Sequence, residues 1–341
     1  AVACGADALG VDWMTLIAWG TSLWADRGPS PVESGEFDPD WAAQRLVNLM
    51  NAWRDQLLEA LGAMGLREVR RLRGEIGRTI SYADEQEKFQ KVLGEVVPRQ
   101  RYKLLRKPEA AEGDFRWPTH LLLSTRYQAH TGRAPQGNME YRVGESDGGF
   151  DRLAFRFELE QTGELHSVPH SNPTGFDLSL PLNRRSDSRP AIDIPSPWYG
   201  AGMSYGSIGL PVMLARARAA QAMNSFMSTG EGGYPDELTP YDQHIITQVA
   251  TGLFGVREDT MQRARILEIK YAQGSKPGLG GHLLGNKNTE SVARIREAVQ
   301  GTSLFSPFPF HSVYSVEDHK KHVDWLKQVN PQALISVKVS T

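Results

Sequence analysis

The chain has 341 residues, of which 40% are hydrophobic, so it is long enough to bury a large core. Its 38 lysines and arginines nearly balance 40 aspartates and glutamates, and the formal net charge of −2 gives no sign of a nucleic-acid partner. No stretch reaches the roughly 20 apolar residues that span a bilayer. A single cysteine excludes an intrachain disulfide and suits a reducing compartment, so we expect a cytoplasmic protein.

The first part of the chain predicts a buried strand and a long helix. Residues 7–12 belong to an apolar run that is typical of a strand, and Cys4 is expected as a small core residue on a helix leading into it. Asp38 and Pro39 combine a helix cap with a first-turn proline and begin a helix over 38–65. Apolar residues at helical spacing then predict its packing face, namely Leu46, Leu49, Met50, Trp53, Leu57 and Leu61.

The middle of the chain carries a weaker pattern. A second short helix is expected over 84–95. Residues 97–196 are rich in Pro, Arg, Ser and Asn, and we interpret them as an extended segment that wraps the rest of the fold. A few short strands, such as 153–158, are expected within it.

From residue 198 strands and helices alternate. The pattern predicts strands at 198–203, 224–228, 265–270 and 334–339, with a short strand-like piece at 303–305. Helices are predicted at 211–223, 287–299 and 315–328, and a helix or turn at 239–251. Ser315 and Asp318 form a capping box for the last helix. This alternation argues for a parallel sheet whose active face lies at the carboxyl ends of the strands.

Three glycine-rich turns follow these strands: AGMSYGSIG (201–209), STGEGG (228–233) and EIKYAQGSKPGLGGHLLG (268–285). Glycine lets backbone N–H groups approach phosphate oxygens, so the series predicts loops gathered around a phosphate-bearing cofactor. With SPFPFHSVYSVEDH (306–319) and ISVKVST (335–341), the series resembles the FMN-binding synthase domain of glutamate synthases. The resemblance implies an α/β (β/α)8 TIM barrel with FMN as cofactor.

The order of the segments departs from that family. Residues 1–20 and the helix at 38–65 resemble the last unit and tail of the barrel, yet they precede its first strand. Strands one to four and eight have candidates, and nothing resembles strands five to seven. We therefore expect an incomplete or permuted barrel: 1–96 as its C-terminal part, 97–196 as the wrapping segment and 197–341 as its first half. A missing or separate stretch between Thr341 and Ala1 is favoured over true permutation, with both termini as cut ends of a larger folded unit.

The resemblance also bears on cofactors and partners. The family's last strand is followed by a cysteine triplet for an iron–sulfur cluster, and residues 17–31 contain no cysteine. No iron–sulfur cluster is expected on this chain, because thiolates hold such clusters. Electrons then come from a separate protein or a nicotinamide. No glutaminase domain is present, so ammonia is free or delivered by a partner; a homo-oligomer stays open.

Lysines end two predicted strands. Lys270 and Lys338 should point into the barrel mouth, where burial requires an anionic partner. That partner is a flavin or a substrate carboxylate, or alternatively a nearby Glu268 or Glu231. The resemblance assigns Lys270 and Gln273 to the flavin and 2-oxoacid site, with Lys270 also expected as a catalytic residue, and brings Lys338 to the flavin ring.

Glu231 lies between glycines and is either a catalytic base, which the resemblance favours, or a solvated turn residue. The resemblance places Gln248 on a flavin-contacting helix and gives cofactor contacts to Met203, Ser204, Tyr205, Gly206 and Thr229. It gives substrate contacts, besides Gln273, to Lys276, Gly280, Gly281 and His311.

Several positions depart from the family pattern in the expected substrate loops. They are Leu253, Leu279, His282, Leu284, Asn286, Asn288, Phe308, Phe310 and Ser312. These changes weaken an assignment to 2-oxoglutarate more than one to FMN. The favoured function is FMN-dependent reductive amination of 2-oxoglutarate to L-glutamate with ammonia. The alternative is a non-catalytic flavin-binding or scaffolding homologue. His319 and His322 in HKKH are expected on an exposed helix face, and no metal site is expected.

Overall fold

The computed structural model describes residues 2, 6, 8–11, 13–19, 37–64, 66–74, 79–81, 117–135, 153–155, 176–183, 191–273 and 280–339. Several expectations fall outside these residues. They are the helix at 84–95, Cys4, Lys276, Leu279 and the two chain ends.

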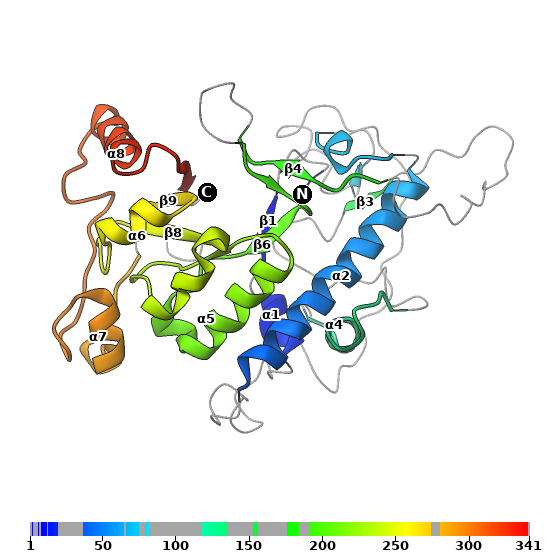
Figure 1. The fold of residues 1–341 in the computed structure, drawn as a ribbon, viewed down its shortest axis with the longest axis horizontal. Helices are drawn as coiled ribbons and strands as arrows, with labels where there is room; N and C mark the ends of the chain where they lie inside the picture. Colours follow the sequence, from blue (N-terminus) through cyan, green and yellow to red (C-terminus); the bar gives the residue numbers. More distant parts are fainter. Residues whose placement is uncertain are drawn as a thin grey trace, which may run out of the picture.

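A six-stranded parallel sheet forms the centre of the molecule (Figure 1). Its order is β1 (Leu9–Val11), β6 (Trp198–Gly200), β7 (Met227–Ser228), β8 (Ile245–Ala250), β9 (Ile266–Lys270) and β10 (Leu334–Lys338). Every adjacent pair is parallel. The sheet is an incomplete α/β barrel, as the sequence predicted. Leu9 pairs with Trp198, which confirms that the strand near the N-terminus lies beside the first strand after residue 197.

One strand was assigned wrongly from the sequence. Residues 239–251 were expected as a helix or turn, but the structure has a 3₁₀ helix, η6 (Asp236–His244), followed by strand β8. All six residues of β8 are buried. A strand covered on both faces lacks the alternation of polar and apolar residues that identifies a half-buried one. The segment after residue 197 therefore supplies five strands instead of four.

Helices cover the outer face of this sheet. Helix α5 (Tyr205–Ala222) follows β6 and is interrupted at Gly209, where φ is 71°, just before Pro211. Helices α6 (Glu258–Arg263), α7 (Glu290–Arg296) and α8 (Val316–Val329) and the short η7 (Gly285–Lys287) lie between the later strands. The Ser315 side chain accepts a hydrogen bond from the Asp318 N–H at the start of α8, which confirms the predicted cap.

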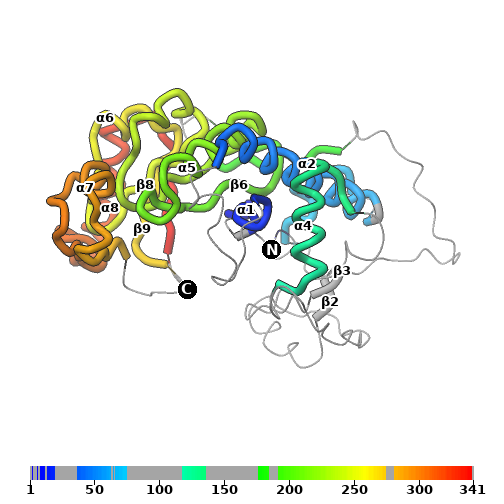
Figure 2. Tube along the Cα trace, turned by 90° about the horizontal axis from the view of Figure 1, so that it is seen from below, coloured from blue at the N-terminus to red at the C-terminus, as the bar shows by residue number. Residues whose placement is uncertain are grey.

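Of the two N-terminal helices, the longer packs against α5 and the shorter packs against the longer (Figure 2). They are α1 (Trp13–Ala18) and α2 (Pro39–Ala63), where the Asp38 side chain accepts a hydrogen bond from the Asp40 N–H and forms the predicted cap. The apolar face predicted for α2 points into the core. Of the six residues predicted for this face, Leu46, Leu49, Met50 and Leu61 are buried, and Trp53 and Leu57 are partly buried. Trp53 meets Trp198 of β6 edge to face, with ring centroids 5.7 Å apart.

The segment 97–196 contains a helix that the sequence did not predict. Helix α4 (Thr119–Thr131) packs against α1 and α2 and ends at Gly132 in the left-handed region. Its buried side includes Ser124, Thr125 and Gln128, so no apolar stripe marks it. The short elements are η2 (Val69–Arg71) and two antiparallel pairs: β2 (Thr79–Ser81) with β3 (Leu153–Phe155), and β4 (Leu180–Pro181) with β5 (Asp193–Ile194). β3 confirms a strand within 153–158.

The buried apolar residues form three clusters. One joins α2 and α5 and contains Trp19, whose Nε1 donates to the Ala42 carbonyl at 2.9 Å. A second fills the sheet's inner face near the start of the strands, around Ile246 and Ile266. The third lies between β8, β9 and helices α6 and α8, around Leu267. Among the described helices, none combines the length and apolarity needed to cross a membrane.

Candidate active site

The inner face of β8, β9 and β10 carries two polar rows towards its carboxyl end. Strand register places the residues of each row side by side, and alternate residues of a strand face the same way. One row is Gln248, Glu268 and Ser336; the next, at the strand ends, is Ala250, Lys270 and Lys338. The two lysines thus lie on neighbouring strands at one end of the sheet, as predicted.

Lys270 is buried with only 5% of its surface exposed. Its Nζ lies 3.1 Å from Glu231 Oε1 and donates a hydrogen bond to Gln273 Oε1 at 2.9 Å. Burial lowers the pKa of Lys270 from its ordinary value, the charge of Lys338 lowers it further, and Glu231 and Glu268 oppose the shift. Of the two carboxylates that the sequence offered as partners, Glu231 makes the contact.

The Glu231 carboxylate is enclosed by the glycine-rich turn that follows β9. Its Oε1 accepts a hydrogen bond from the Gly281 N–H at 2.6 Å. A Cβ added to Gly280 would lie 3.1 Å from Oε2, so a side chain at this position would crowd the carboxylate. The structure therefore brings Glu231, Lys270, Gln273 and the 280–281 turn into one polar cluster.

A further member of the cluster, Arg296 of α7, was not identified from the sequence. Its side chain is 5% exposed, and Nη1 donates to the Gly281 carbonyl at 2.8 Å. The guanidinium lies over the Phe254 ring, 5.7 Å from its centroid. Burial lowers the pKa of Arg296, against the opposing charge of Glu231. The sequence contains one indication that Arg296 is buried. It lies four residues after the apolar Val292, and residues four apart share a helix face.

The turn after β7 lies against the loop after β6. Gly230 has φ of 66°, and a Cβ there would come within 2.6 Å of the Ser204 backbone nitrogen and 2.7 Å of the Met203 carbonyl carbon. Thr229 is buried, and its Oγ1 accepts a hydrogen bond from the Gln248 N–H at 3.2 Å. Met203, Ser204, Thr229 and Gln248 are thus neighbours beside the lysine row.

Gln248 lies on strand β8, which corrects the expectation that a helix would carry it. The residue is 5% exposed, and its Nε2 donates to Glu268 Oε1 at 2.6 Å. Its Oε1 is buried and has no hydrogen-bond partner among the described residues. A buried acceptor left unpaired is costly, so this atom fits a donor on a bound group.

Two of the expected cofactor residues begin helix α5. Tyr205 is partly buried and packs against the cluster between α2 and α5. Gly206 is exposed, and an added Cβ would meet Val292 of α7 at 3.6 Å. Both remain predicted cofactor contacts through their position after β6.

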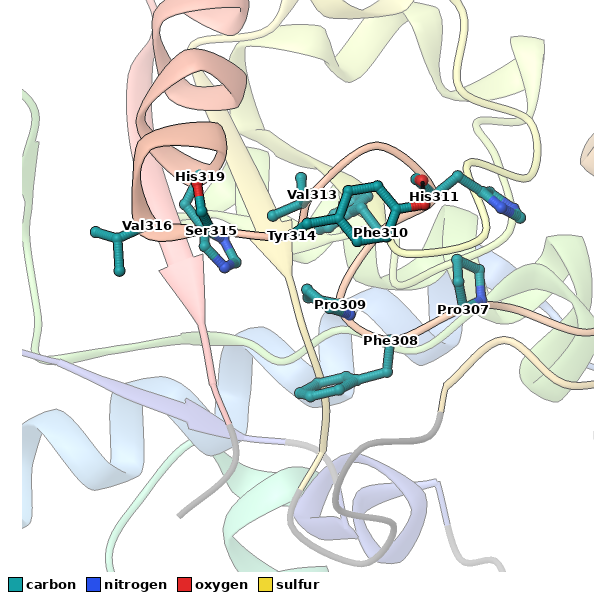
Figure 3. Close-up of a pocket in the computed structure, with 10 residues that line it drawn as sticks. All are labelled: Pro307, Phe308, Pro309, Phe310, His311, Val313, Tyr314, Ser315, Val316 and His319. Atoms are coloured by element: carbon teal, nitrogen blue, oxygen red, sulfur yellow. Dashed lines mark hydrogen bonds between the residues drawn. The ribbon is translucent and has the colours of Figure 1, made fainter.

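His311 lies apart from this cluster, in the loop before α8. Its ring is exposed and its carbonyl oxygen accepts a hydrogen bond from the Tyr314 hydroxyl at 2.8 Å. It lines a pocket of about 530 Å³ together with Phe308, Phe310 and His319 (Figure 3). The substrate role expected of His311 stays a prediction, as does that of Lys276.

The HKKH histidines are not on a fully exposed face, contrary to the sequence expectation. His319 Nδ1 lies 2.6 Å from the Tyr271 hydroxyl, and His322 stacks on Trp325 with centroids 5.4 Å apart. The apolar surroundings lower the pKa of His322, and His319 adds to this. Aromatic residues of the neighbouring loop create this burial, which helical spacing alone does not reveal. In the described part of the chain, no three metal-binding side chains gather.

Comparison with known proteins identifies the family of this chain. The conserved region in glutamate synthase matches residues 159–341, more than half of the chain. This chain belongs to the glutamate synthase family. The match covers β4 to β10 and every residue of the polar cluster.

Several glutamate synthases are similar over part of their length. An archaeal glutamate synthase [NADPH] of Methanocaldococcus jannaschii is 45% identical over 139 residues, which are 41% of this chain and 27% of that protein. An archaeal-type enzyme of Thermotoga maritima is 42% identical over 144 residues, 42% of this chain and 28% of the relative. The glutamate synthase [NADPH] large chain of Azospirillum brasilense is 40% identical over 144 residues, 40% of this chain and 10% of the relative. The matches therefore span less than a third of these three relatives.

Proposed function

We propose that this chain provides the FMN-binding half-barrel of a glutamate synthase-type oxidoreductase, which reductively aminates 2-oxoglutarate to L-glutamate with ammonia. The observation that carries the proposal is the buried Lys270–Glu231 pair at the carboxyl ends of parallel strands, beside an unpaired Gln248 acceptor. Parallel α/β barrels place their active sites at this end.

The residues present fit a flavin. Gly230 leaves no space for a Cβ against Met203 and Ser204, so the two loops after β6 and β7 meet backbone to backbone without an intervening side chain. Gln248 offers a buried acceptor. Met203, Ser204, Tyr205, Gly206, Thr229, Gln248, Lys270 and Lys338 would hold FMN. Bound FMN would supply the hydride for reduction of the substrate.

Lys270 and Lys338 would bind and orient anionic groups. Two adjacent cations at a partly dry site attract a carboxylate strongly, because charge-assisted hydrogen bonds are shorter and stronger than neutral ones. Lys270 would hold the 2-oxoacid with help from Gln273, Lys276, Gly280, Gly281 and His311. The Gly281 N–H donates to Glu231 and Arg296 donates to the Gly281 carbonyl, so these two hydrogen bonds hold the 280–281 turn against the polar cluster.

Glu231 would move the proton of ammonia or of the imine formed from the 2-oxoacid. Its Oε1 lies 3.1 Å from Lys270 Nζ, so the carboxylate would lie next to a substrate bound by that lysine. Proton transfer by a positioned carboxylate contributes about 10²–10⁴-fold to a rate. Ammonia and electrons would come from separate proteins or from solution, and no iron–sulfur cluster is proposed on this chain.

The test is a half-reaction of the bound flavin. We expect the protein to bind FMN, to bleach when reduced anaerobically, and to regain its colour when 2-oxoglutarate and ammonium are added together. Glu231→Gln should slow re-oxidation by about 10²-fold or more. Lys287→Met, an exposed lysine outside the cluster, is the matched control and should re-oxidise normally.

Flavin that binds and bleaches but is not re-oxidised by 2-oxoglutarate with ammonium would contradict the synthase proposal. That result would favour the non-catalytic flavin-binding homologue. Formation of L-glutamate, detected by chromatography, separates amination from non-specific flavin oxidation.

A further inference from the structure

The pair Gln248–Glu268 is buried in the middle of the inner face. Gln248 and Glu268 are register partners on β8 and β9, exposed by only 5% and 6%. Their side chains are joined by a hydrogen bond of 2.6 Å from Gln248 Nε2 to Glu268 Oε1. Such a short contact between an amide and a carboxylate is typical of a charge-assisted bond.

A glutamine side chain can present either its carbonyl or its NH₂ group to a given neighbour. An ionised carboxylate offers only acceptors, so it binds the NH₂ end. Glu268 therefore determines which way the Gln248 amide is turned. The carbonyl oxygen Oε1 is directed away from Glu268 and stays unpaired among the described residues.

The surroundings keep this arrangement in place. A Cβ at Gly202 would lie 3.1 Å from Gln248 Nε2, so the loop after β6 closes tightly over the amide. Glu268 also lines a cavity of about 370 Å³ with Tyr199 and Ser336. Burial raises the pKa of Tyr199, and the charge of Glu268 raises it further, which keeps the phenol neutral beside the carboxylate. Lys270, two residues along β9, is the nearby cation.

We propose that Glu268 is a positioning residue that fixes the Gln248 amide so that its carbonyl oxygen accepts a hydrogen bond from the ring N3–H of a bound flavin. The inference rests on the proposed function. The flavin N3–H is an imide N–H between two ring carbonyl groups. Such a donor can pair with the single unpaired acceptor, Gln248 Oε1. A turned amide would instead leave its NH₂ group facing that N–H, donor against donor, at the cost of an unsatisfied buried group.

The test compares FMN binding by three variants, with flavin fluorescence as the readout. Glu268→Gln keeps the shape of the side chain at position 268. It no longer fixes the orientation of the Gln248 amide, because the new amide can either donate or accept. We expect its FMN dissociation constant to rise about three- to tenfold, the equivalent of one lost hydrogen bond. Glu258→Gln, on the exposed side of α6, is the matched control and should bind as the wild type does.

The exchanged pair Gln248→Glu with Glu268→Gln restores a defined orientation. The amide introduced at position 268 would donate to one oxygen of the carboxylate introduced at position 248, and the other oxygen would accept from N3–H. We expect its dissociation constant to return to within about twofold of the wild type. The exchanged pair also serves if Glu268→Gln alone does not fold, because it keeps one carboxylate and one amide in the same volume.

NMR of FMN labelled with ¹⁵N at N3 gives an independent readout. A single downfield N3–H signal is expected in the wild type and the exchanged pair, and a shifted or doubled signal in Glu268→Gln. Equal FMN affinity and N3–H signals in wild type and Glu268→Gln would refute the inference alone. A folded exchanged pair that binds no better than Glu268→Gln would do the same. Wild-type protein that binds no FMN would refute the proposed function and this inference with it.

Discussion

The contact between the turn after β7 and the loop after β6 depends on the absence of one side chain. We predict that Gly230→Ala destabilises the protein and weakens FMN binding together. Two costs add. The first is the left-handed backbone at φ of 66°, which costs an L-residue roughly 1–2 kcal/mol.

The second cost is steric. The new Cβ would lie 2.6 Å from the Ser204 nitrogen and 2.7 Å from the Met203 carbonyl carbon, both shorter than ordinary van der Waals contact. These are backbone atoms, so they move only if the whole loop shifts. Overpacking of this kind costs about 1–3 kcal/mol, which gives a total of about 2–5 kcal/mol.

Gly301→Ala separates the two costs. Gly301 has φ of 75°, and no atom lies within 4 Å of an added Cβ, so this variant carries the backbone cost alone. Urea unfolding followed by tryptophan fluorescence gives both free energies, with an unchanged m-value as the check that the unfolded states match. FMN titration should show weaker binding only for Gly230→Ala. Equal destabilisation of the two variants would refute the steric argument.

Three further predictions concern buried polar groups. Arg296→Met should lower the free energy of unfolding by about 1–3 kcal/mol, because the Gly281 carbonyl loses its hydrogen-bond donor. Thermal melts test this, and Arg296→Lys should restore part of the loss. An unchanged melting temperature in Arg296→Met would contradict the prediction. The pKa of Lys270 is lowered in the folded protein, so the unfolded chain binds more protons in the pH range below 10.5. The free energy of unfolding should therefore rise with pH towards 10.5. Equal slopes of this free energy against pH in wild type and Lys270→Met would contradict the prediction. Asn330→Ala should cost about 2–3 kcal/mol, since Nδ2 donates to three carbonyl oxygens within 261–264, and a loss below about 0.5 kcal/mol in urea unfolding would rule out that role.

Local signals predicted the elements whose ends or faces are chemically marked. Asp38 with Pro39 identified the start of α2, and Ser315 identified the cap of α8, because both side chains satisfy backbone N–H groups at that point. The strands β9 and β10 were also predicted within one residue at each end. Each precedes a turn or loop and carries β-branched residues.

The elements that were missed owe their form to tertiary contacts. Strand β8 is covered on both faces, and helix α4 buries Ser124, Thr125 and Gln128 against its neighbours. Neither shows the periodicity that a single sequence can display. Their structure depends on what packs against them, and that information is spread over distant segments.

The sequence predicted the central pair of the candidate site, and it did not reveal the arginine that packs against this pair. Lys270 ends strand β9 and Glu231 lies in the glycine-rich turn after β7, so the parallel topology brings both to the same end of the sheet. Arg296 acts from a helix that lies later in the chain, and charged residues on helices are usually solvated. Its burial depends on Phe254 and on the carbonyl of the 280–281 turn, neither of which its own sequence neighbourhood indicates.

The pairing of β1 with β6 has a consequence for how this sheet assembles. β6 to β10 follow one another along the chain, whereas β1 joins residues 9–11 to residues 198–200. Closing so long a loop costs more conformational entropy than any neighbouring connection, and contacts distant in sequence form late in folding. The five sequential strands should therefore form a cooperative unit first, with β1 added last. In native-state hydrogen exchange, the amides that join β1 to β6 should open at lower free energy than those between β8 and β9.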